Sequence, residues 1–160
     1  MVTVRSAVIR YLSNAIMLAI VAMALLGVLE QDGRAHAETS AGAAEIDYPE
    51  VTRQGLKPTL VVTVENRDRV AREVSVDLAS SYVEALQLGI VSPDPSEARG
   101  VGSDQLRWTF TPIGPGERLR AVFAFSIDQQ HPGLRANSPV RVAVGDEVVL
   151  QAEITTTVLP

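Results

Sequence analysis

The longest apolar feature of the chain is an uncharged run of nineteen residues, Tyr11–Leu29, enclosed by Arg10 and Glu30. A helix of this length spans roughly 28 Å, close to the ~30 Å hydrocarbon core of a bilayer. Nine of the residues are Leu, Ile or Val, and these contribute about 3 to 5 kcal/mol in favour of insertion. We therefore predict one N-terminal transmembrane α-helix at 11–29.

The charges beside this run predict its orientation. Arg5 and Arg10 precede it, whereas Glu30 and Asp32 follow it. Because positive charge is retained on the cytoplasmic side, residues 1–10 are expected in the cytoplasm and the C-terminal part outside the cell membrane. The protein would then be a single-pass membrane protein with an extracytoplasmic domain.

A cleaved signal peptide is the competing interpretation, in which 11–29 is the signal h-region. Ala35-His36-Ala37 before Glu38 has the small-x-small form of a signal peptidase site. Against cleavage, the apolar run exceeds the usual length of about 7 to 15 residues, and the site lies eight residues beyond the run. Cleavage after Ala37 would release a secreted soluble domain.

Strand-like alternation dominates the sequence that follows. Residues 30–43 show no apolar periodicity and predict a flexible linker, so the domain is expected at 44–160. Pro49 predicts an edge strand at Ile46–Val51, Ser81-x-x-Glu84 predicts one helical turn, and Ser92–Asp104 predicts a loop. Further alternating runs are Leu60–Val64, Val74–Leu78, Leu86–Val91, Leu106–Phe110, Leu119–Ile127, Val140–Val144 and Val148–Val158, with turns at Pro112–Glu117 and Gly145-Asp146.

Seven to eight short strands separated by turns predict an all-β fold, an Ig-like antiparallel β-sandwich. Trp108, Phe123 and Phe125 should form the centre of its core. The run LVVTVEN at Leu60–Asn66 and the run LRWTFTPIGPGERLRAVFAFSI at Leu106–Ile127 resemble bacterial extracytoplasmic Ig-like domains of the DUF11-type, or conserved-repeat, kind. The resemblance covers most of 44–158 and implies a cell-surface module without catalytic residues, here in a single copy behind an anchor.

Charge and composition exclude several classes of function. The chain contains no cysteine, which removes disulfides, thiolate metal sites and a cysteine nucleophile. The net charge is −5, and with 17 acidic and 11 basic residues from Glu38 onward it is about −6 in the domain. Nucleic-acid binding requires a basic surface, so no nucleic-acid partner is expected.

No motif for catalysis or cofactor binding is present. His36 and His131 have no second ligand at metal spacing, and no serine lies in a Gly-x-Ser-x-Gly motif. We expect no enzyme activity, cofactor, metal or small-molecule substrate. The predicted function is a membrane-anchored binding or accessory module that acts through protein partners in the envelope. For the secreted alternative, the expected partner is a cell-wall or surface component.

The segment Leu86–Pro95 is the predicted partner contact, since it is free of charge before Asp94 and ends in a Pro-rich loop. The residues assigned to this contact are Leu88, Ile90, Val91, Pro93 and Pro95.

Overall fold

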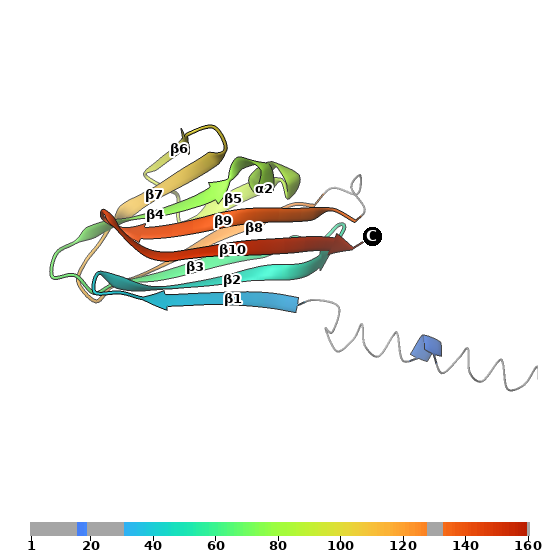
Figure 1. Cartoon of the computed structure of the whole chain (residues 1–160), viewed down its shortest axis with the longest axis horizontal. Helices are drawn as coiled ribbons and strands as arrows, with labels where there is room; N and C mark the ends of the chain where they lie inside the picture. The colour runs from blue at the N-terminus through green and yellow to red at the C-terminus, as the bar shows by residue number, and fades with distance from the viewer. Residues whose placement is uncertain (1–15, 19–30, 128–132, 160) are drawn as a thin grey trace, which may run out of the picture. The chain divides into compact units, whose positions relative to one another are not determined.

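The computed structural model describes residues 16–18, 31–127 and 133–159, and it shows an almost entirely β protein (Figure 1). Residues 1–10 and most of the predicted transmembrane helix lie outside the described residues, as does His131. Within the described ranges, no helix is long and apolar enough to span a bilayer. The elements are β1 (Gln31–Glu38), β2 (Gly42–Arg53), β3 (Thr59–Asn66), β4 (Arg72–Ala79), α2 (Ser80–Ala85), β5 (Leu88–Ser92), β6 (Glu97–Val101), β7 (Gln105–Ile113), β8 (Arg118–Phe125), β9 (Arg135–Val144) and β10 (Glu147–Leu159).

The strands form one continuous, curled sheet that folds back on itself. Its order is β5-β8-β3-β2-β10-β9-β4-β7-β6, with β1 paired to β2 outside this path. In Figure 1, β3 and β8 lie behind β10 and β9, which gives the two layers of a sandwich. This confirms the all-β class, with ten strands in the described sheet where seven to eight were predicted.

Strand β2 passes from one layer to the other. It pairs antiparallel with β3 over Gly42–Asp47 and parallel with β10 over Val51–Arg53. Pro49 lies between the two pairings, where its missing N–H breaks no ladder of hydrogen bonds. The prediction of an edge strand at Ile46–Val51 was wrong, and the sheet is not purely antiparallel.

The two layers enclose one apolar core, as the alternating strands predict. Phe123 and Phe125 are fully buried and Trp108 nearly so. Trp108 from β7 packs edge-to-face on Phe123 from β8, with ring centroids 5.2 Å apart. Because this contact joins opposite layers, the predicted centre of the core is confirmed.

The segment predicted as a flexible linker differs in the structure. Residues Gln31–Glu38 form β1 and pair with β2, which begins at Gly42. Ala35 and Ala37 pack against the core, whereas Asp32, Arg34 and His36 alternate with them. Small residues in these positions carry little hydrophobic signal, so the sequence reading missed a period of two.

The segment predicted as a loop at Ser92–Asp104 contains β6, a second strand that the sequence did not indicate. Four of the five residues of β6 are exposed, and β6 pairs with β7 from Glu97↔Thr109 to Val101↔Gln105. Gly102, with φ +69°, makes the turn between the two strands. Backbone pairing rather than burial of side chains therefore holds β6.

The helical turn predicted from Ser81 and Glu84 is present as α2, but no side chain caps its N-terminus. The helix is fixed instead by Tyr82, which is fully buried and donates a hydrogen bond to Thr156 Oγ1 at 2.8 Å. Thr156 in turn donates to the Pro49 carbonyl at 2.6 Å. This buried chain of hydrogen bonds ties α2, β10 and β2 together, and it positions the start of β5.

Candidate interaction surface

The outward faces of β1, β2, β3 and β8 carry most of the ion pairs found in the described residues. Side chains on a strand alternate between the two faces, so the inward positions hold core residues such as Val62 and Val64, whereas Thr63 and Glu65 point outward. The register sets Glu65 opposite Arg118 on β8 and Ala43 on β2. We call this surface the charged face. Its charged members are Arg34, His36, Glu38, Glu45, Asp47, Glu65, Arg67, Arg118 and Arg120.

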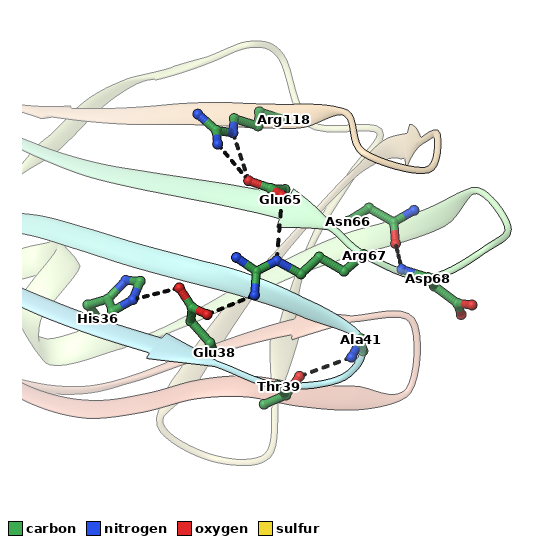
Figure 2. Close-up of polar contacts among 9 residues, drawn as sticks. All are labelled: His36, Glu38, Thr39, Ala41, Glu65, Asn66, Arg67, Asp68 and Arg118. Atoms are coloured by element: carbon green, nitrogen blue, oxygen red, sulfur yellow. Dashed lines mark hydrogen bonds and ion pairs between the residues drawn. The ribbon is translucent and has the colours of Figure 1, made fainter.

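A chain of ion pairs runs across the charged face, as Figure 2 shows. The Glu65 carboxylate accepts from Arg118 Nη2 at 2.7 Å and lies 3.5 Å from Arg67 Nε. Arg67 Nη1 donates to Glu38 at 2.8 Å, and His36 Nε2 lies 3.3 Å from the same carboxylate. These five side chains line a hollow of about 170 Å³.

The arginines change the proton affinity of the carboxylates they contact. The hydrogen bond from Arg118 holds the pKa of Glu65 below its usual value, and the hydrogen bond from Arg67 does the same to the pKa of Glu38. Each carboxylate therefore stays ionised to lower pH than a free glutamate does. The carboxylates of Glu38 and Glu65 are thus already paired with cationic side chains within the hollow.

The described lining of the hollow includes one histidine, His36. Its side chain is half-exposed and forms its ion pair with Glu38. Among the described residues, no group of three His, Asp or Glu side chains is placed to hold a metal ion. The acidic residues Asp94, Glu97 and Asp104 belong to this described set and likewise form no such group.

Two further polar clusters lie outside the charged face. Asp77 on β4 is almost fully buried and receives both Nε and Nη2 of Arg107 on β7 at 2.7 Å each. Asp68 accepts from Arg72 at 2.7 Å in the turn between β3 and β4. In both cases the sequence shows an acid and an arginine, but only the strand register or the turn brings them together.

The five residues predicted as a partner contact lie on β5 and the loop after it. Leu88 and Val91 are partly buried and pack against the core, which leaves them only partly available. Ile90 is the most exposed large apolar residue of the described β-domain, with 68% of its surface accessible. Pro93 is exposed and Pro95 partly so.

Ile90 continues into an apolar stripe on the outer side of its sheet. It is paired with Ala124 on β8, and Val122 on β8 is in turn paired with Val61 on β3. All three of these neighbours are partly exposed. We call Val61, Ile90, Val122 and Ala124 the apolar stripe. It shares the outer side of β3 and β8 with the charged face, so this side combines an apolar end with a charged end.

The likeness to known structures concerns the fold. A cohesin module from a Clostridium perfringens family 33 glycoside hydrolase matches with a TM-score of 0.50 and 13% sequence identity, over 76% of this chain and 98% of the module. The cohesin module is an Ig-like β-sandwich domain. The CARDB domain of the PF1109 protein from Pyrococcus furiosus matches at 15% identity over 76% of this chain and 96% of that domain, with a TM-score of 0.40.

Comparison of the sequence itself gives no relatives. No protein-family model matches the chain, and no curated protein matches it either. The Ig-like class is thus supported by structure, while the resemblance of this Ig-like domain to conserved-repeat domains stays a prediction.

Proposed function

We propose that the protein is a membrane-anchored, non-catalytic Ig-like module that binds a protein partner in the cell envelope. The observation that carries the binding role is Ile90, a large apolar side chain that is exposed on β5, while its neighbours Leu88 and Val91 pack against the core. Ile90 belongs to the apolar stripe, and contiguous exposed apolar surface is typical of protein interaction sites. The Ig-like fold is compatible with such a role.

Strand β1 supports the anchored form over the secreted one. The candidate cleavage site after Ala37 lies within this strand, so cleavage would remove seven of its eight residues, 31–37. Ala35 and Ala37 would then no longer pack against the core, and β2 would lose a neighbouring strand. A domain that uses residues 31–38 as a strand favours retention of the uncharged run Tyr11–Leu29 just before them.

The test uses the full chain with a C-terminal tag, expressed in bacterial cells. Mass spectrometry of the membrane fraction should give the uncleaved chain, and a species that begins at Glu38 would refute the anchor. A photo-crosslinking amino acid at Ile90 should give a protein adduct in intact cells. The matched control is Val70, an apolar residue with 51% exposure in the turn between β3 and β4. Equal adducts at both positions, or none at Ile90, would refute the binding role.

A further inference from the structure

The described sheet has three edge strands, β1, β5 and β6. Proteins usually protect such edges with charged side chains, because unpaired backbone groups recruit other strands. Strand β6 carries Glu97 and Arg99, and β1 carries four charged or titratable side chains among its eight residues, the last of them Glu38 at its end. Strand β5, with the sequence LGIVS, carries none. Among the three edge strands of the described sheet, β5 alone has no charged side chain that would oppose the addition of another strand.

The backbone of β5 is held in place and is open on one side. It pairs with β8 from Leu88↔Phe125 to Ser92↔Val122, with a bulge between Leu88 and Ile90. Because β5 ends the strand order, the backbone groups that point away from β8 have no strand partner in the described sheet. The bulge on one side and Pro93 on the other limit the regular open stretch to Ile90–Ser92.

The charges that flank β5 in the sequence indicate the chemistry of its occupant. Between Ser80 and Ala98 the chain carries Glu84, Asp94 and Glu97 and no Lys or Arg. A second copy of β5 would therefore bring acidic residues near acidic residues, which disfavours self-pairing. An extended segment with an apolar centre and basic flanks would meet complementary charge, while its apolar side chains would cover Ile90.

We infer that β5 is the site at which a partner adds an extended strand of apolar residues flanked by Lys or Arg, through backbone hydrogen bonds to Ile90–Ser92. This inference rests on the proposed binding function and specifies its mode. Main-chain pairing gives such complexes their affinity, and the side chains on alternate positions give specificity. Three residues of open edge make a small contact, so the isolated segment should bind weakly.

The experiment uses synthetic peptides as probes with the full chain in detergent. The first peptide is acetyl-Lys-Lys-Val-Thr-Val-Thr-Val-Lys-Lys-amide, the second replaces its lysines by glutamates, and the third replaces the central Val by Pro. Fluorescence anisotropy should show the first peptide binding at least about tenfold more tightly than either of the others. Amide hydrogen exchange within Leu88–Ser92 should slow only when the first peptide is added.

Two variants assign the binding to the edge. Ile90→Lys places a charge on β5 and should abolish binding of the first peptide, whereas Val70→Lys adds the same charge elsewhere and should not. Binding that is equal for the proline peptide, or that survives Ile90→Lys, would overturn the inference, as would concentration-dependent self-association that Ile90→Lys removes. If the Ile90 crosslink forms in cells but no peptide slows exchange in β5, strand addition is refuted while the proposed binding function stands.

Discussion

At the scale of single residues, the side chain of Asn66 makes three hydrogen bonds to backbone groups of the described β-domain. It is fully buried at the end of β3, and its Nδ2 donates to the carbonyls of Val70 and Ile113 at 2.9 and 2.8 Å. Its Oδ1 accepts from the Asp68 amide at 2.9 Å. One side chain thus joins β3, the turn after it and the end of β7.

Removal of the Asn66 amide should destabilise the domain strongly. Asn66→Ala removes the donor to the buried Ile113 carbonyl and to the partly buried Val70 carbonyl, and we expect a loss of about 3 kcal/mol in the free energy of unfolding. Asn66→Asp keeps the acceptor for Asp68 but loses both donors, so it should be destabilised by a similar amount. Denaturant unfolding measures both variants, with a lower midpoint and an unchanged m-value. A loss below about 1 kcal/mol would contradict the role of the two donated bonds.

Glu65 carries the prediction on pH. Because Arg118 lowers the pKa of Glu65 in the folded state, this carboxylate stabilises the fold above its unfolded pKa of about 4.3, and the contribution is lost as pH falls through the folded pKa. Arg118→Gln should raise the pKa of Glu65 in an NMR titration. Arg120→Gln is the control, since Arg120 lies on the same strand opposite Thr63. An equal shift in both variants would indicate a general charge effect.

At the scale of elements, the sequence revealed strands with large apolar residues and missed those without them. The alternation of Val, Leu and Phe identified β3, β8 and β9, since most of their inward positions hold apolar residues. Strand β1 buries only small side chains against the core, and β6 buries almost none. Both are held chiefly by backbone pairing with a neighbouring strand, β1 with β2 and β6 with β7. Backbone pairing leaves no apolar alternation in the sequence.

The candidate site shows the same division. Ile90 could be predicted because an apolar residue in a short uncharged run is visible locally. The ion-pair chain could not, because Glu38, Glu65 and Arg118 come from three strands and meet through their register. The bidentate contact between Asp77 and Arg107 depends likewise on the pairing of β4 with β7.

Strand β1 gives a prediction at this scale. A soluble chain that begins at Gln31 retains the strand, whereas one that begins at Glu38 lacks its pairing with β2 and the packing of Ala35 and Ala37. We expect the shorter chain to be less stable by about 2 kcal/mol, or roughly 6–10 °C in Tm. Differential scanning calorimetry compares the two. Equal melting temperatures would show that 31–37 adds nothing to the domain, and would weaken the argument against cleavage.

For the whole molecule, the length of chain between the uncharged run and the first strand determines the reach of the domain. Leu29 ends the run and β1 begins at Gln31, and two residues of extended chain cover at most about 7 Å. If the run is a retained anchor, as proposed, the sequence leaves only Glu30 between it and the first strand of the domain that carries β5. A partner in the same membrane would then meet it at a high effective concentration.

Lengthening this connection should therefore weaken partner capture without changing the domain. An insertion of twenty Gly and Ser residues between Glu30 and Gln31 gives a flexible chain with an end-to-end distance of about 25 Å, so the effective concentration of β5 near a membrane-embedded partner falls. The crosslink at Ile90 should decrease severalfold, while the Tm of the domain stays constant. An inserted helical spacer of equal residue number serves as the control, because it moves the domain away in a defined direction. An unchanged crosslink yield with both insertions would indicate a partner that is not embedded in the membrane. Binding at the β5 edge would then not depend on the anchor.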